Sequence, residues 1–223
     1  MTPPPKNAPG KKRRTLGINP AIRENRRREL IEAAIHVIAR HGRAGCTVGR
    51  VAREAQLSQG LMNFHFKSMD LLLAAAFDHL AEEFDVIWRA RVAKAGAAPW
   101  ERLAAMIEAY FAPEVFSSEK LAVWFSFWVD PDLRDEFRTA SVKVERRYHR
   151  EIEPDVARLL EAAQTSEPEQ EAARITGMLT AMVDGYWLQA LLYPKVFRPK
   201  AAVTACLDFL RIAIDKPASS SQR

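Results

Sequence analysis

Cysteine is scarce in this chain of 223 residues, which has only Cys46 and Cys206, far apart in the sequence. This excludes the disulfide framework of a small secreted domain, and we expect two free thiols in a reduced cytoplasm rather than a disulfide or a redox sensor. Long apolar runs are absent too, since none approaches the roughly 20 residues that a membrane-spanning helix needs. No secretory signal is recognisable. The sequence therefore predicts a cytoplasmic protein with no membrane partner.

Patterns typical of β-structure and of catalysis are also missing. No β-alternation and no Asn-Gly or Asp-Gly turn lies between apolar runs, and there is no internal repeat. The five histidines show no H-x-x-x-H spacing, and no cysteine or carboxylate cluster indicates a metal site. Glu145 and His149 share a helix face, which we interpret as a surface pair. Without a Gly-rich phosphate loop or a G-x-S-x-G elbow, we expect no enzyme, no cofactor and no metal.

Apolar residues recur at helical spacing from residue 20 to residue 215, which predicts an all-α fold. Capping residues, or prolines in a first turn, mark the helix starts. The expected starts are Asn19-Pro20, Thr47, Ser58, Ser68, Pro99, Ser117 or Ser118, Asp130-Pro131, Ser166 with Pro168, and Pro199. Pro154 is expected to kink or divide the long helix that begins at Asp130-Pro131.

Basic residues gather near the N-terminus. Residues 1–70 hold 14 Lys and Arg against 5 Asp and Glu, whereas residues 71–223 hold 19 against 23. This asymmetry predicts that the N-terminal part binds a polyanion. The tail over 1–18 contains the run 11–14 (KKRR) and is expected to be disordered. That run could reach along phosphates or into a minor groove, or stay solvated without a fixed contact.

Residues 47–72, TVGRVAREAQLSQGLMNFHFKSMDLL, predict two short helices joined by a tight turn, with a third helix directly behind. This is the helix-turn-helix plan, whose second helix enters the major groove of double-stranded DNA. We expect the residues that face the DNA bases to be Gln59, Leu61, Met62, Asn63 and His65. Gly60 would allow close approach, and Thr47, Arg50, Ser58 and Lys67 suit phosphates. Phe64 and Phe66 are expected to pack against the first helix.

Small residues recur every four positions at Ala173, Gly177, Ala181 and Gly185, which places them on one helix face. Such a stripe allows another helix to approach closely. The last helix offers an apolar face of its own, with Val203, Leu207 and Leu210. One reader helix covers only half a DNA site, so we expect a two-fold homodimer on a near-palindrome, paired through these faces. The alternative is that the small stripe packs inside the monomer.

Aromatic residues concentrate in two segments of the C-terminal part. Trp124 and Trp128 share a helix face with Phe127 beside them, and Asp184 precedes Trp187 in a mostly apolar helix. Several ring faces with one carboxylate suit a quaternary ammonium ligand, because the rings attract the cation and little needs a hydrogen bond. An ordinary aromatic core, with Asp184 paired to an arginine or a backbone N–H, is the other interpretation.

The 47–72 segment resembles the DNA-binding domain of TetR-type repressors, which runs roughly T-x-x-x-[IV]-A-x-x-A-G-[VL]-S-x-G-x-x-Y-x-Y-F-x-S-K-x-x-L-[LF]. Gln56 stands in place of the usual turn glycine, His65 in place of a tyrosine, and Met69 in place of a lysine. The patterns W-x-x-F-W and D-G-x-W-L in the two aromatic segments resemble the BetI branch, which represses choline-to-betaine genes and is released by choline.

The resemblance implies a helix-turn-helix domain over 19–67, a helical ligand-binding and dimerisation domain over 68–216, and a frayed tail over 217–223. It implies an operator as DNA partner and choline, or another quaternary ammonium compound, as effector. The ligand residues would be Tyr110, Trp124, Phe127, Trp128, Asp184 and Trp187. Pairing through the last two long helices, and signalling through the helix after residue 68, are implied as well.

Other functions remain open at the level of the sequence. A helical interaction protein that has lost DNA binding would share this fold, and salt-dependent affinity for DNA would distinguish it. A regulator of the same type that senses another small molecule is a further alternative. So is an activator, or a constitutive repressor without a ligand.

Overall fold

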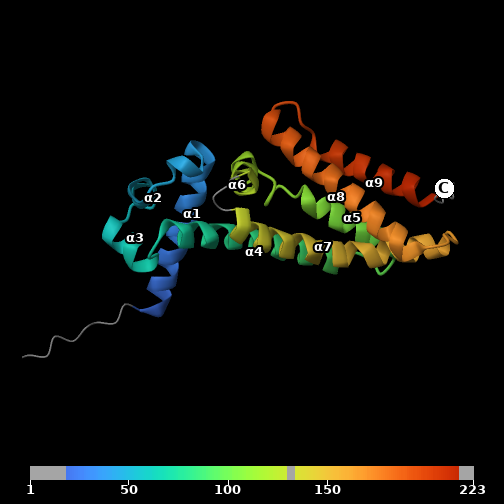
Figure 1. The fold of residues 1–223 in the computed structure, drawn as a ribbon, viewed down its shortest axis with the longest axis horizontal. Coiled ribbons are helices and arrows are strands. Elements are labelled where there is room, and N and C mark those ends of the chain that lie inside the picture. Colours follow the sequence, from blue (N-terminus) through green and yellow to red (C-terminus); the bar gives the residue numbers. More distant parts are fainter. Residues whose placement is uncertain (1–18, 130–133, 216–223) are drawn as a thin grey trace, which may run out of the picture.

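The computed structural model describes residues 19–129 and 134–215, with the side chains of 129 and 134–146 left aside. Within these ranges the chain is helical and has no strand, as predicted (Figure 1). The helices are α1 (Pro20–His41), a 3₁₀ turn η1 (Arg43–Gly45), α2 (Val48–Glu54), α3 (Gln59–His65), α4 (Met69–Lys94), α5 (Pro99–Tyr110), α6 (Ser118–Val129), α7 (Arg134–Ala162), α8 (Pro168–Leu192) and α9 (Pro199–Asp215). Both predicted tails and the Asp130-Pro131 helix start lie outside the described residues.

The predicted caps begin the first four α-helices. Asn19 Oδ1 accepts a hydrogen bond from the backbone N–H of Ala21 (3.0 Å). The hydroxyls of Thr47, Ser58 and Ser68 each accept one from the N–H three residues later, at 3.4, 3.1 and 3.2 Å. Each bond satisfies a donor that the first helical turn leaves unpaired. The local sequence thus fixes where the helix-turn-helix begins and ends.

The turn between α2 and α3 places Gln56 at φ +55°. A side chain with a Cβ atom is strained in this left-handed region by about 1–2 kcal/mol. Gln56→Gly should therefore raise the free energy of unfolding by about 0.5–1 kcal/mol, after the larger backbone entropy of unfolded glycine is subtracted. Urea denaturation measures this, and Gln56→Ala, which keeps the Cβ atom, should bring no gain. An equal gain in both variants would show that the side chain, rather than the φ angle, is responsible.

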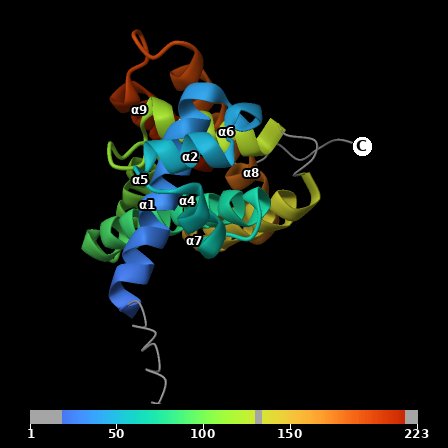
Figure 2. The same cartoon turned by 90° about the vertical axis from the view of Figure 1, so that its left-hand side faces the viewer.

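The helices form two regions joined by α4. The helices α1, α2 and α3 gather at one end, and α4 runs from this end along the rest of the molecule (Figure 1). Figure 2 looks onto the α1–α3 end. α7 and α8 pack side by side, α5 contacts α4, α7 and α9, and α6 packs against α1. One continuous apolar core runs through both regions.

α7 continues through Pro154, so of the two expected effects, a kink or a division, the division is wrong and the kink stays a prediction. A proline removes a single backbone donor, and the long helix is held on both sides of it by α5 and α8. Among the described helices, none combines the length and the apolar character that crossing a membrane requires.

Candidate functional site

The reader helix α3 presents a polar surface at the end of the molecule. Gln59, Gly60 and Asn63 are exposed on it, and Leu61 and His65 are half-buried. The residues predicted for phosphates, Thr47, Arg50, Ser58 and Lys67, are also exposed. The Arg50 guanidinium donates to the carbonyl oxygen of Gly45 (2.8 Å), which orients it beside the start of α2. The exposed groups are thus amides on α3 with hydroxyls and cations around them, as the predicted contacts with base edges and phosphates require.

One prediction about α3 is wrong, and a second holds only in part. Met62 is fully buried in the core and has no surface for DNA. Phe64, expected to pack against the first helix, meets it through the guanidinium of Arg23 but is 52% exposed. Because α3 has only seven residues and carries apolar side chains on most sides, its sequence does not fix which of them turns inward. Phe66 is buried, as predicted.

Two arginines of α1 lie over the rings of this segment. The Arg23 guanidinium is 5.5 Å from the centre of the Phe64 ring, and that of Arg27 is 5.3 Å from the Phe66 ring. Cation–π contacts of this kind hold arginine near the reader helix while leaving its N–H groups for an anion. Burial and the nearby charge of Arg23 lower the pKa of His65, so this residue is a neutral imidazole at pH 7.

The predicted aromatic residues of α6 and α8 come together. The Trp128 and Trp187 rings are stacked, with centres 6.3 Å apart and planes 11° apart. Trp124 lies 6.3 Å from both of these rings. The Trp187 indole N–H donates to the carbonyl oxygen of Tyr110 (3.2 Å), which fixes the ring against the end of α5. Trp128 is 39% exposed and the other three are nearly buried, so this group reaches the surface at Trp128.

α4 contributes further rings, none of which was predicted to bind the ligand. Phe77 contacts Trp124 and Phe127 edge-to-face, at 5.0 and 5.4 Å. Further along α4, Phe84 and Trp88 lie against Tyr110 and against Tyr148 of α7, with ring centres 4.6 to 5.6 Å apart. The spacing of these α4 residues was visible in the sequence, but nothing in it distinguishes a ring in an ordinary core from one beside a ligand. We call the full set the aromatic cluster; its members are Phe77, Phe84, Trp88, Tyr110, Trp124, Phe127, Trp128, Tyr148 and Trp187.

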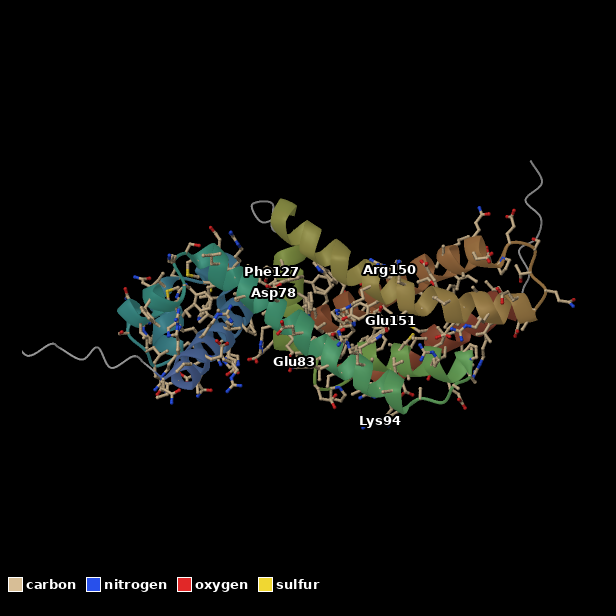
Figure 3. All side chains as sticks on the ribbon, turned by 90° about the horizontal axis from the view of Figure 1, so that it is seen from below. Asp78, Glu83, Lys94, Phe127, Arg150 and Glu151 are labelled. Carbon is tan, nitrogen blue, oxygen red and sulfur yellow. The ribbon has the colours of Figure 1, made fainter. Side chains whose placement is uncertain are left out.

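Asp184 and Trp187 differ in burial. Asp184 is exposed on α8, whereas Trp187 is buried, and the pairing of this carboxylate with the rings stays a prediction. A different carboxylate is present: Glu151 of α7 accepts a hydrogen bond from the Trp88 indole N–H (2.5 Å). Figure 3 shows Glu151 between α4 and α7. Glu151 was not predicted from the sequence, because an acidic residue in a charged helix gives no signal of its own.

Charged groups border the aromatic cluster on the same side. Arg147 pairs with Asp85 (2.6 Å), and its guanidinium donates to the Tyr148 hydroxyl (3.2 Å). Burial, which outweighs the opposing hydrogen bond from Arg147, raises the pKa of Tyr148 to about 12. The phenol therefore stays neutral at physiological pH and presents an uncharged ring and hydroxyl.

The predicted small-residue stripe is a surface of the protomer. Ala173, Gly177, Ala181 and Gly185 are all exposed on α8, and the alternative that they pack inside the monomer does not hold. Large apolar side chains are also exposed on α8, in the segment after it and on α9: Met178, Leu188, Leu192, Tyr193, Val196 and Ile212. On α9, Val203 and Leu207 are half-buried. Leu210 is fully buried within the protomer, so its assignment to an interface is wrong.

Both cysteines are buried and free, as predicted. Burial raises the pKa of the Cys46 and Cys206 thiols to about 11. Thiols in this state are poor nucleophiles at neutral pH, which suits apolar core residues better than a redox sensor.

Comparison with known proteins gives two matching family models. Residues 30–76 match the model of bacterial regulatory proteins of the tetR family. Residues 99–215, more than half of the chain, match the C-terminal model of BetI-type transcriptional repressors. The helix-turn-helix and most of the aromatic cluster lie within these two ranges.

Curated relatives cover almost the whole chain. The HTH-type transcriptional regulator BetI of Paraburkholderia phytofirmans is 30% identical over 196 residues, which span 86% of this chain and 95% of the relative. The protein of the same name from Brucella suis is 31% identical over 189 residues, spanning 85% and 91%.

Solved structures give the same fold. A putative transcriptional regulator from Pseudomonas aeruginosa PAO1 is 27% identical with a TM-score of 0.63, over 90% of this chain and 94% of that one. A putative transcriptional regulator from Saccharomonospora viridis, in complex with choline, has a TM-score of 0.67 at 20% identity, over 84% and 96%. The relatives are regulators rather than enzymes, and this chain belongs to the tetR family of transcriptional regulators, with a BetI-type repressor C-terminal domain.

Proposed function

We propose that the protein is a homodimeric repressor that binds a near-palindromic operator and is released by choline or a closely related quaternary ammonium compound. The observation that carries this proposal is the aromatic cluster, in which rings from five helices converge in a chain of BetI type. The genes under its control would then be those of choline and glycine betaine metabolism, and its place of action the cytoplasm.

Recognition of DNA is assigned to the exposed side of α3. Asn63 and Gln59 can form paired hydrogen bonds with adenine, Leu61 can contact a thymine methyl group, and Gly60 leaves room for the backbone to approach. The rim of Thr47, Arg50, Ser58 and Lys67 would hold phosphates and fix the register, and His65 at the end of the helix would face the bases. The arginines that stack on Phe64 and Phe66 add positive charge to this surface.

Pairing of two protomers is assigned to the exposed apolar surface of α8 and α9. Backbones can approach closely at Gly177, Ala181 and Gly185 because these residues are small, and Leu188, Leu192 and Ile212 are exposed on α8 and α9. An apolar surface of this extent on a monomer is a typical protein–protein contact. A two-fold axis between the α8 helices would place two α3 helices on successive half-sites.

The effector is assigned to the aromatic cluster because its rings attract a cation through their faces. The choline-bound Saccharomonospora viridis structure supports this ligand class through its shared fold. The cluster also contacts two helices that lead to the DNA-binding end. Phe77 and Phe84 belong to α4, which follows directly after the reader helix α3. Trp124 and Phe127 belong to α6, which packs on α1. A difference of a few kcal/mol between two arrangements of these helices would suffice for a switch.

Fluorescence anisotropy of the purified protein tests the proposal, with a duplex from the region that flanks its own gene. Tight, salt-sensitive binding that choline weakens would support it. If choline, betaine aldehyde and tetramethylammonium all leave tight binding unchanged, the assigned ligand class is contradicted, but the proposed repressor function stands. If the affinity for this duplex is no greater than for random DNA, the proposed operator binding is contradicted. The alternative function, a helical interaction protein, then gains support.

Asn63→Ala should reduce the preference for operator over random DNA by about 10-fold, because one paired hydrogen bond to a base is lost. Binding to random DNA should stay nearly unchanged, since phosphate contacts supply it. Competition anisotropy with both duplexes measures the ratio. Lys67→Ala is the matched control and should weaken both affinities alike; an unchanged ratio in Asn63→Ala would exclude Asn63 as a base-reading residue.

A further inference from the structure

We propose that Glu151 is the carboxylate that holds the cationic head of the effector, in the part of the aromatic cluster between α4, α5 and α7. This inference rests on the proposed effector class and names the residue that would select it. In the ligand-free arrangement the Trp88 indole N–H occupies this carboxylate at 2.5 Å. A quaternary ammonium would take the place of that N–H.

The rings around Glu151 have the geometry of a cation-binding group. Tyr148 lies three residues before Glu151 on α7, so both project from one side of that helix. Its ring contacts Trp88 at 4.6 Å and Phe84 at 4.9 Å, and lies 6.3 Å from Tyr110. Four aromatic side chains from three helices are therefore in mutual contact, and one of them, Trp88, holds the Glu151 carboxylate. Tryptophan and tyrosine faces attract cations most strongly, and a desolvated site strengthens the attraction.

Asp85, rather than Glu151, forms the ion pair with Arg147, although the charge of Glu151 also acts on that guanidinium. Arg147, the neighbouring cation on the same helix, pairs with Asp85 at 2.6 Å. Among the described residues, no lysine, arginine or histidine forms an ion pair with Glu151, whose hydrogen-bond partner is the neutral indole of Trp88. A half-buried carboxylate with only a neutral donor gains more from a cation than one already in an ion pair.

Displacement of Trp88 would couple the ligand to α4. Trp88 is fully buried in the middle of the contact between α4 and its neighbours, and Phe84 lies one turn closer to the DNA-binding end. When a cation replaces the indole N–H at Glu151, Trp88 must find a new position. Because α4 carries Trp88 and begins directly behind α3, that movement reaches the reader helix.

Isothermal titration with tetramethylammonium chloride tests the role of Glu151 independently of DNA. Glu151→Gln keeps the shape and an acceptor for Trp88 but removes the charge, and it should weaken binding by about 30-fold. Glu153→Gln on α7 is the matched carboxylate-to-amide control and should change the affinity less than 3-fold. Asp184→Asn on α8 tests the competing carboxylate predicted from the sequence and should likewise change the affinity less than 3-fold. Wild-type protein should also prefer choline over 3,3-dimethylbutan-1-ol, the neutral molecule of the same shape, and Glu151→Gln should lose most of that preference.

Other outcomes would overturn the inference. Unchanged tetramethylammonium affinity in Glu151→Gln, or a loss confined to Asp184→Asn, would place the carboxylate elsewhere while the proposed effector class stands. Wild-type protein that binds choline and its neutral analogue equally would exclude a charge partner even if the variant fails to fold. If the wild-type protein binds neither choline nor tetramethylammonium, both the role of Glu151 and the proposed effector class are contradicted. The operator experiment would still test the repressor function separately.

Discussion

Gly177→Leu is expected to convert the protein from a dimer to a monomer and to weaken operator binding by at least about 100-fold, since each protomer would then bind a single half-site. The protomer itself should tolerate the change. Gly177 is exposed in the middle of α8, and a Cβ atom built there meets nothing within 4 Å. Leucine also favours a helix more than glycine does, by roughly 0.5–1 kcal/mol. The substitution thus harms the interface while improving the helix.

Sedimentation velocity, circular dichroism and operator anisotropy on the same samples measure the three consequences. Ala90→Leu is the matched control, because Ala90 is exposed on α4, away from the small-residue stripe. The control should remain a dimer with full operator affinity. A Gly177→Leu protein that stays dimeric and binds the operator normally would show that α8 does not form the interface. A monomer that still binds with full affinity would contradict the need for two reader helices.

Helix starts were predictable because their causes are local. A capping hydroxyl or an N-terminal proline acts within one turn, and Thr47, Ser58 and Ser68 each make the bond that the sequence implies. The start of α8 was placed correctly by Pro168 as well. The division at Pro154 was misjudged for the complementary reason, since tertiary packing of α7 outweighs one missing backbone donor.

Side-chain direction was less predictable, because it depends on how helices dock. Met62 and Leu61 are adjacent apolar residues of a short helix, and only packing decides that Met62 turns inward. Asp184 and Trp187 lie three residues apart near the border between the buried and exposed sides of α8, so the sequence allowed both on one side. The contact between Trp88 and Glu151 joins residues 63 positions apart. Helical spacing in the sequence predicts neighbours within one helix and cannot predict a contact between residues so far apart.

Asp155→Asn should lower the free energy of unfolding by about 2–3 kcal/mol, which is less than the 3–5 typical of a broken buried pair. Asp155 of α7 is 1% exposed, and its Oδ2 accepts a hydrogen bond from Arg102 of α5 at 2.9 Å. Arg158 lies 3.2 Å from the other oxygen. The arginine side chains are 32% and 53% exposed, so water partly solvates them when the partner charge is lost, which reduces the penalty.

Urea denaturation at one fixed protomer concentration is the measurement, because unfolding of a dimer depends on concentration. Arg158→Ala is the control and should cost less than about 1 kcal/mol, since it removes only the exposed member of the group. Arg102→Met combined with Asp155→Leu should recover most of the loss, because an apolar pair of similar volume needs no desolvation of charge. A loss below 1 kcal/mol in Asp155→Asn would mean that the ion pair between α5 and α7 contributes little, and that apolar contacts alone hold α7 against the helix that carries Tyr110.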